Sequence, residues 1–275
     1  MTNSEIHVSR SEKIILDHGS LQSIVVLVKD SLDLEIVLPE KTSGSCYVRF
    51  NGNGKLQMTV NAHMDTNWSF LIVNESEDSI EFEENWRLNK NAQLQIAVGE
   101  LTSGNHIKSV NYHLLEEGSS LYVRGANLVQ SKLEATLKAI HYKGNTTAQI
   151  DNYGIVLQEC EYTLDVIGKI EKAAKNAKTH QISRVMNFGL KPKTSVNPKL
   201  IIDENDVEAS HAASMGQPDI LQVHYLQSRG LSRSESLKLI SLGYLLPIVD
   251  VIEDEIVKEK LKEAVIEKIN NSSLM

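Results

Sequence analysis

The segment Leu133-Glu134-Ala135-Thr136-Leu137 alternates apolar and polar residues, and this alternation decides the fold class. In a β-strand, successive side chains point to opposite faces, so the alternation places one set against a core and the other toward solvent. The same pattern recurs between about residue 21 and residue 202, in the segments 47–50, 56–60, 94–98 and 121–123. The sequence therefore predicts a mainly β structure over this part of the chain.

Turn-forming residues separate these segments. They are Asn51-Gly52-Asn53-Gly54, Ser103-Gly104-Asn105, Glu117-Gly118-Ser119 and Lys143-Gly144-Asn145. Short strands with frequent turns are typical of a β-sandwich, a β-barrel or a β-solenoid. The periodicity does not choose among these three architectures, because no clean sequence repeat is present.

The chain changes character after about residue 205. Gln217-Pro218-Asp219 predicts the start of a helix that runs to Ser228 and is closed by Gly230. Ser232-Arg233-Ser234-Glu235 has the form of a capping box and predicts a second helix that ends at Gly243.

A third helix is predicted over residues 254–269, with an apolar stripe on one face. The residues on this face are Val257, Leu261, Ala264, Val265 and Lys268. We therefore divide the chain into a β body over residues 1–205 and a C-terminal helical domain over residues 206–275.

The composition restricts the class of protein. Lys and Arg number 28 and Asp and Glu number 36, which gives a net charge of −8. This charge argues against a nucleic-acid partner, since such partners require a basic surface, and against an anionic membrane surface. The polar start of the chain predicts no signal peptide, and no apolar run is long enough to span a bilayer. Cys46 and Cys160 form neither a CxxC pair nor a disulfide framework, so we expect a cytoplasmic protein.

Known catalytic motifs are absent from the sequence, among them GxSxG, HExxH, the Walker A motif and GxGxxG. We therefore expect a protein that is not an enzyme. An alternative is a β-helix protein that binds or cleaves carbohydrate, although no spacing of carboxylates singles out such a site. The segment from Asp203 to Gly216 runs from acidic residues into His211, whose neighbours are small, so a metal or another chain could approach its imidazole.

The segment from about residue 167 to residue 246 resembles the C-terminal core of the SufB/SufD family of iron–sulfur cluster assembly proteins. The resemblance rests on a series of blocks in order: residues 167–172, 181–186, 197–203, Asp206-Val207, Ser210-His211-Ala212-Ala213-Ser214 with Gly216, and Tyr225-Leu226-Gln227-Ser228-Arg229-Gly230-Leu231. The Ser-His-Ala-Ala-Ser block followed by Ser-Arg-Gly-Leu is more similar to the SufD side of the family than to the SufB side.

This resemblance implies a right-handed parallel β-helix followed by a small C-terminal α-helical unit. It also implies a scaffold subunit of the SUF system with SufB and the ATPase SufC as partners, and a homodimer when the subunit is alone. No stably bound cofactor is expected, only transient iron or an iron–sulfur cluster at a subunit interface.

The resemblance also suggests roles for particular residues. His211 corresponds to a suggested metal-handling position near the junction of two subunits. The docking surface for SufC is expected at Tyr225, Leu226, Arg229, Leu242, Tyr244 and Leu245. No cysteine lies near the cluster position of SufB-type members, so a ligand of that kind is not expected.

Overall fold

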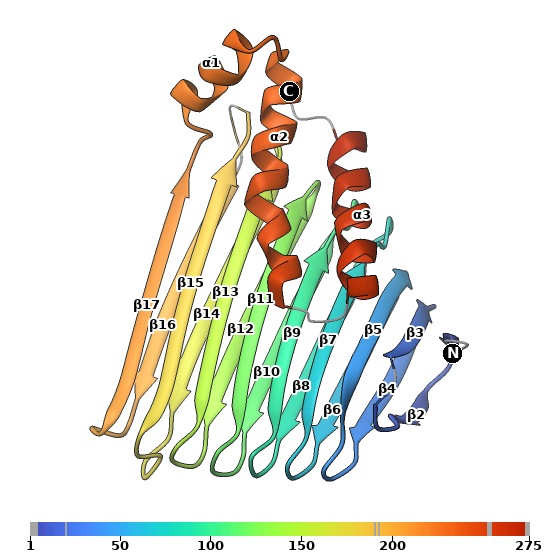
Figure 1. Cartoon of the computed structure of the whole chain (residues 1–275), viewed down its shortest axis with the longest axis vertical. Helices are drawn as coiled ribbons and strands as arrows, with labels where there is room; N and C mark the ends of the chain where they lie inside the picture. Colours follow the sequence, from blue (N-terminus) through green and yellow to red (C-terminus); the bar gives the residue numbers. More distant parts are fainter. Residues whose placement is uncertain (1–4, 20, 190, 192, 252–254, 273–275) are drawn as a thin grey trace.

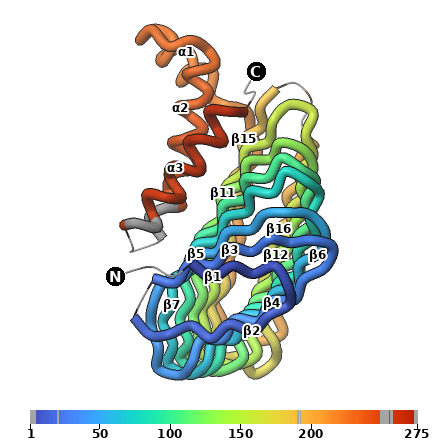
Figure 2. The backbone as a smooth tube through the Cα atoms, turned by 90° about the vertical axis from the view of Figure 1, so that its right-hand side faces the viewer, coloured from blue at the N-terminus to red at the C-terminus, as the bar shows by residue number. Residues whose placement is uncertain are grey.

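The protein is described by a computed structural model that covers residues 5–19, 21–189, 191, 193–251 and 255–272. Two parallel β-sheets form the walls of an elongated solenoid, and helices lie against one of them (Figures 1 and 2). The nine-stranded sheet, here the odd sheet, contains β1 (Glu5–Val8), β3 (Leu21–Val28), β5 (Ser43–Gly52), β7 (Asn67–Asn74), β9 (Gln93–Glu100), β11 (Ser120–Val129), β13 (Thr147–Val156), β15 (Ala177–Asn187) and β17 (Val207–Gly216). The eight-stranded sheet, here the even sheet, contains β2 (Glu12–Ile15), β4 (Ser31–Leu38), β6 (Gly54–Ala62), β8 (Ile80–Leu88), β10 (His106–Leu114), β12 (Lys132–His141), β14 (Glu161–Ile170) and β16 (Lys193–Ile202).

Consecutive strands alternate between the two sheets, so each coil of the chain adds one strand to each wall. Within a wall, neighbouring strands are parallel and in register. Leu121 of β11, for example, lies between Leu94 of β9 and Ala148 of β13. This arrangement confirms the predicted parallel β-helix and excludes the sandwich and the barrel.

The strand register stacks like side chains inside the solenoid, which we call the lumen. Its largest buried side chains include Phe50 of β5, Phe70 of β7, and Phe82 and Trp86 of β8. Phe50 packs edge-on against Phe82, with ring centroids 4.9 Å apart, and Phe70 packs edge-on against Trp86 at 5.1 Å. The hydrophobic core is therefore one continuous column between the walls.

The C-terminal helices are α1 (Ile220–Ser228), α2 (Arg233–Leu245), the 3₁₀ helix η1 (Leu246–Val251) and α3 (Glu255–Asn271). The predicted capping box is confirmed, because Ser232 Oγ accepts from Glu235 N at 3.2 Å and Glu235 Oε2 accepts from Ser232 N at 2.7 Å. α2 runs two residues past Gly243, where the sequence analysis wrongly ended it. None of the helices in the described ranges has the length and apolar content that would span a bilayer.

The helical unit is attached to the outer face of the odd sheet. η1 contacts β9 and β11, α2 contacts β13, and α3 contacts β7, whereas α1 projects away from the sheets (Figures 1 and 2). Leu261 of α3 lies directly over Gly99 of β9, where an added Cβ would come within 3.3 Å of its Cδ1 atom. Arg124 of β11 fixes η1, because its Nη1 donates to the carbonyl oxygen of Pro247 at 2.7 Å.

The strands continue to Gly216, beyond the boundary predicted at 205/206. The segment 207–216, which was assigned to the helical part, forms β17 of the solenoid. The division of the chain into two domains stays a prediction.

One histidine is enclosed by the solenoid near the end of β12. His141 is fully buried, and its Nδ1 lies 2.7 Å from Thr146 Oγ1, while its Nε2 has no hydrogen-bond partner among the described residues. Burial lowers the pKa of His141 from 6.5 to about 4, because the imidazolium form would lose its hydration. The folded chain therefore holds this side chain neutral.

We predict that His141 makes the protein less stable as the pH falls. Between about pH 6.5 and pH 4, His141 is protonated in the unfolded state but stays neutral in the folded state. The free energy of unfolding therefore decreases by up to about 3 kcal/mol as the pH falls through this range. In the variant His141→Leu this component of the pH dependence should be absent in urea denaturation at pH 7, 5.5 and 4.5. Equal pH profiles for wild type and His141→Leu would contradict the prediction.

Candidate functional site

The solenoid ends in an open edge at β17. Nine of the ten residues of this strand are exposed, and the tenth, Val207, is half-buried. β17 pairs with β15 on one side and is the last strand of its sheet, so the hydrogen-bonding groups on its other side face outward. Its small side chains, Ala209, Ala212 and Ala213, would let another backbone approach closely.

His211 lies in the middle of this edge strand. It is in register with Gln181, which is buried in the lumen, whereas the neighbouring Ser210 bonds to His180 on the outer side at 2.7 Å. Because side chains alternate along a strand, His211 belongs to the row that continues the lumen to its open end. His211 is exposed and therefore does not lie in a closed hydrophobic core. Within the described ranges, no group of three or more His, Cys, Asp or Glu side chains is arranged to hold a metal ion.

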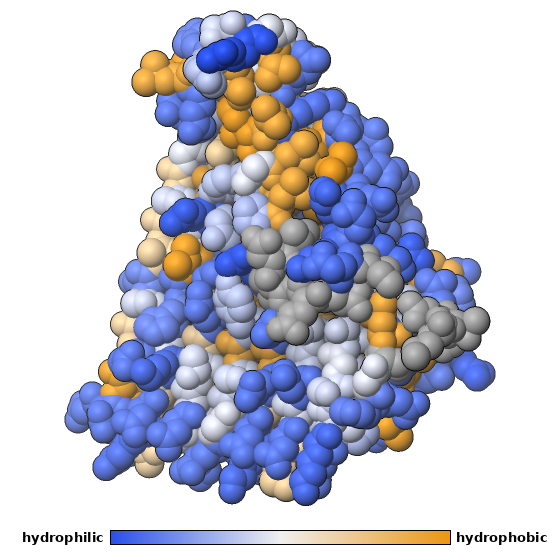
Figure 3. Space-filling view, in the orientation of Figure 1, coloured by the Kyte–Doolittle hydropathy of each residue, from blue (hydrophilic) through white to orange (hydrophobic). Residues whose placement is uncertain are grey.

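An apolar groove lies between α1 and α2. Leu221, Tyr225 and Leu239 are 73%, 59% and 49% exposed, which is unusual for large apolar side chains. Together with Gln222, Leu226 and Ile240 they line the groove, here the α1–α2 groove, and hydrophobic side chains gather over these helices (Figure 3). The guanidinium group of Arg229 lies 5.2 Å from the centre of the Tyr225 ring at one side of it.

The structure separates the predicted docking residues into two groups. Tyr225 and Leu226 line the groove and Arg229 is exposed beside it. Leu242 and Tyr244 are half-buried against the solenoid, and Tyr244 packs edge-on against Tyr153 of β13 at 5.9 Å. Leu245 is only 1% exposed, so its side chain anchors α2 and is closed to a partner in this arrangement.

The sequence analysis missed four residues of the groove, Leu221, Gln222, Leu239 and Ile240. A signal for one of them was present, because Leu221 and Tyr225 are four residues apart and so lie on the same face of α1. Leu239 and Ile240 could not be assigned in this way, since the sequence does not show which face of α2 opposes α1.

Both cysteines are buried free thiols. Burial raises the pKa of Cys46, and burial together with the charge of Glu159 raises the pKa of Cys160. A thiol whose pKa is raised is a weak nucleophile and a weak metal ligand at neutral pH. Neither cysteine is therefore activated in this structure.

Four charged or titratable side chains meet inside the lumen: Glu84 of β8, Glu100 of β9, and His106 and Lys108 of β10. All are at most 5% exposed. Lys108 Nζ lies 3.0 Å from Glu84 Oε1 and 3.6 Å from Glu100 Oε1, and His106 Nδ1 is in contact with Glu100 Oε2. Trp86 Nε1 donates to Glu84 Oε2 at 3.0 Å. We call these four residues the lumen cluster.

Two members of the lumen cluster, Glu100 and Lys108, keep their charges through contact with their neighbours. Burial alone would raise the pKa of Glu100, but the neighbouring His106 and Lys108 lower it to about 2. Burial would likewise lower the pKa of Lys108, yet Glu84 and Glu100 together hold it above its usual value of 10.5. The charges of Glu100 and Lys108 are therefore stabilised by buried neighbours of opposite charge.

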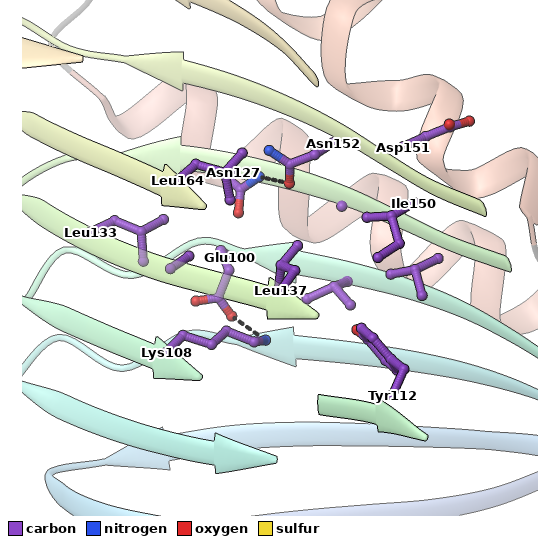
Figure 4. A pocket seen from close by; sticks show the side chains of 14 residues that line it. Glu100, Lys108, Tyr112, Asn127, Leu133, Leu137, Ile150, Asp151, Asn152 and Leu164 are labelled. Atoms are coloured by element: carbon purple, nitrogen blue, oxygen red, sulfur yellow. Dashed lines mark hydrogen bonds and ion pairs between the residues drawn. The ribbon is translucent and has the colours of Figure 1, made fainter. Parts of the chain in front are cut away.

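A small cavity adjoins the lumen cluster. Glu100, Lys108, Tyr112 and Asn127 contribute to its wall, and Asn127 Nδ2 donates to Asn152 Oδ1 at 2.9 Å (Figure 4). Its volume of about 20 Å³ has room for roughly one water molecule. The cavity is therefore too small for an organic substrate.

We predict that removing the central cation of the lumen cluster is strongly destabilising. Lys108→Met leaves Glu84 and Glu100 buried without their ammonium partner, so the free energy of unfolding should fall by about 3–5 kcal/mol. The matched control is Lys55→Met, which breaks the solvent-exposed ion pair with Glu81 and should cost less than about 1 kcal/mol. Urea denaturation measures both variants, and equal effects would contradict a buried network.

Comparison with known proteins agrees with this geometry. The family model described as "SUF system FeS cluster assembly, SufBD core domain" matches residues 12–244. The iron–sulfur cluster assembly protein SufD of Bacillus subtilis is 32% identical over 184 residues, which is 66% of this chain and 42% of that protein. A SufBD family protein of Pyrococcus horikoshii is 30% identical over 120 residues, or 44% of this chain and 27% of that protein. SufD of Escherichia coli is 28% identical over 74 residues, or 27% of this chain and 18% of that protein.

The matched segments cover less than half of the length of each of these relatives. The family model, however, spans nearly all strands of the solenoid and also helices α1 and most of α2. Two of the relatives carry the name SufD, which agrees with the resemblance found in the sequence. The chain therefore belongs to the SufB/SufD family of the SUF iron–sulfur cluster assembly system, on its SufD side.

Proposed function

We propose that this chain is a non-catalytic scaffold subunit of SUF iron–sulfur cluster assembly that pairs with SufB and docks the ATPase SufC. The observation that carries the proposal is the separation of two exposed surfaces on one stiff body. β17 is an open strand edge at one end of the solenoid, and the α1–α2 groove lies on the projecting helices. A protein that joins two partners needs two such surfaces.

The open edge is the surface for a second SufB/SufD-type chain. An unpaired strand edge readily adds a strand from another molecule, and among the described strands β17 has a neighbour, β15, on one side alone. The exposed face of β17 carries Ala209, Ala213 and Met215 in the row that continues the lumen, so a second solenoid end would also cover apolar surface. In the absence of SufB, two copies of this chain pair in the same way as a homodimer.

The α1–α2 groove is the surface for SufC. An apolar groove between two helices suits an apolar segment of a partner, and the exposed Leu221 and Tyr225 supply the contact area. Leu245 and Tyr244 hold α2 on the solenoid, so a displacement of the docked ATPase acts on the β-helix through α2 and η1. The continuous strand ladders then transmit this displacement to the junction at β17.

His211 is the residue of this chain that handles iron or the nascent cluster, which are cargo of the scaffold. A neutral imidazole is a suitable ligand for iron, and its place on the open edge puts it next to the second chain. The remaining ligands come from that second chain. The binding is transient, because a scaffold must release what it assembles.

We predict that charges placed in the α1–α2 groove abolish SufC binding. Leu221→Asp and Tyr225→Asp each force a carboxylate into an apolar contact without a partner charge, which should weaken binding by about 100-fold. Gln227→Asp introduces the same charge on the opposite side of α1 and is the control. Quantitative co-purification with SufC measures the effect, and circular dichroism checks that the helices remain. If both groove variants retain SufC at the wild-type level, the assignment of the groove is wrong.

We predict that two substitutions on β17 separate pairing from iron handling. Ala213→Lys places an ammonium group where two solenoid ends meet, so the purified chain should become monomeric in light scattering and should lose SufB. His211→Ala should keep both SufB and SufC but lower iron–sulfur cluster maturation in cells several-fold, because only the ligand is removed.

The opposite end of the solenoid provides the control for pairing. Ile15→Lys changes an exposed apolar residue on β2 and should leave the dimer intact. A wild-type chain that is monomeric at micromolar concentration would refute pairing through β17. Full cluster maturation in His211→Ala would show that the imidazole of His211 has only a structural role in β17 and does not handle iron.

A further inference from the structure

The outer face of the even sheet carries a regular pattern of ion pairs. Its strands display lysine and arginine side chains that point away from the lumen, and most of them contact a carboxylate on the same or the neighbouring strand. The paired cations are Lys13 with Glu35, Lys55 with Glu81, Lys132 with Glu134, Lys169 with Glu171, Lys193 with Glu161 and Lys199 with Asp165. The face is therefore largely neutralised by its own side chains.

Two cations of this face are exceptions. Arg87 of β8 and Lys138 of β12 have no carboxylate partner within the described part of the chain, although both strands carry glutamates elsewhere. Both flank His113 of β10. Arg87 is in register with His113, and Lys138 is in register with Asn111, two residues before His113 on the same strand. Strand spacing places the Cα atoms of Arg87 and Lys138 roughly 12 Å apart, so their long side chains can converge above β10.

His113 between them is held in a fixed orientation. Its Nδ1 lies 3.1 Å from the hydroxyl of Tyr142 and its Nε2 lies 3.4 Å from Asn85 Oδ1, and its ring stacks on that of Tyr142. Partial burial lowers the pKa of His113, and the charges of Arg87 and Lys138 lower it further. The positive potential of the two cations is thus focused on the imidazole.

The side chains around His113 are polar, whereas Arg87 also borders a hollow that contains the carboxylates of Glu12, Asp33 and Glu35. Asn61 lies beside Arg87 on β6, and Asn85, Asn111 and the Tyr142 hydroxyl surround His113. Because the Oδ1 atom of Asn85 is engaged by His113, its amide nitrogen is directed to another acceptor. Hydrogen-bond donors and unpaired positive charge therefore meet on one small area of a chain whose net charge is −8.

We propose that Arg87, Lys138 and Asn85 form a binding site for a small oxyanion, a phosphate or a carboxylate group, above His113, whose ring is held in place by Tyr142. The guanidinium fork of Arg87 binds two oxygens of such a group, Lys138 adds a second positive charge, and the Asn85 amide donates a further hydrogen bond. The site lies on the even sheet, whereas the α1–α2 groove lies on helices that cover the odd sheet. It is thus independent of the surface assigned to SufC.

The His113 ring provides a direct probe of this site. The full chain is titrated with inorganic phosphate, and in a second series with citrate, at an ionic strength held constant with sodium chloride, while the His113 ring resonances are followed by NMR. A bound oxyanion should give a saturable shift and should raise the pKa of His113, because it offsets the charges of Arg87 and Lys138. Saturation by phosphate, by citrate or by both supports the site and identifies which oxyanion it prefers.

Matched variants connect the shift to the proposed residues. Arg87→Gln and Lys138→Gln should each weaken binding about tenfold, because each removes a charge-assisted hydrogen bond. Lys55→Gln, which removes a paired cation from the same face, should leave the affinity unchanged. The proposal is overturned if neither anion gives a saturable shift, or if Lys55→Gln weakens binding as much as Arg87→Gln does.

Discussion

The in-register parallel pairing of successive coils is the constraint on which the rest of this structure depends. Each strand pairs in register with the strand two steps earlier in the chain. A strand residue therefore lies next to a residue of the previous coil whose side chain points to the same face. Rows of side chains therefore run along the whole solenoid, on the lumen side and on the outer side. Val60, Trp86 and Tyr112 form one such row inside the lumen, and the ion pairs of the even sheet form others.

The same constraint creates the surface proposed for a second chain. A coil can satisfy its hydrogen bonds and cover its lumen side chains only by stacking on another coil. β17 has a neighbour on one side alone, so its backbone edge and the lumen row that includes His211 remain open. No strand covers β17 at this end of the described solenoid. A strand of another β-helix could pair with β17 through the same parallel hydrogen bonds that join successive coils.

A few buried side chains attach the helical unit to the solenoid, whereas the side chains of the α1–α2 groove stay exposed. Leu245, Tyr244 and the carbonyl group of Pro247 attach α2 and η1 to strands β9, β11 and β13. α1 contributes little to this attachment and carries the exposed side chains of the α1–α2 groove. Behind the attachment, on the lumen side of β9, lies Glu100 with its ion pairs to His106 and Lys108.

The sequence by itself determined the strands, the turns and the helix caps, because these depend on local patterns. Ser232 and Glu235 form the predicted capping box since the residues are three apart, and period-2 alternation found the β body without help from tertiary contacts. The choice of a parallel β-helix required the resemblance to a family, because alternation is the same in a sandwich, a barrel and a solenoid. The run Phe82-Glu83-Glu84-Asn85-Trp86 even placed Glu84 in the inward row of Phe82 and Trp86, but its inward charge could not be interpreted without its partner.

Only the tertiary structure decided which residues meet. Lys108 and Glu100 come from opposite walls, and Arg87, His113 and Lys138 come from three successive coils, so no spacing in the sequence relates them. The roles of Leu245 as an anchor and of Leu221 as an exposed groove residue were likewise fixed by the face of the odd sheet on which α2 packs. The physical reason is that burial and charge pairing are properties of neighbours in space, and coiling brings together residues about 25 positions apart that local propensities do not connect.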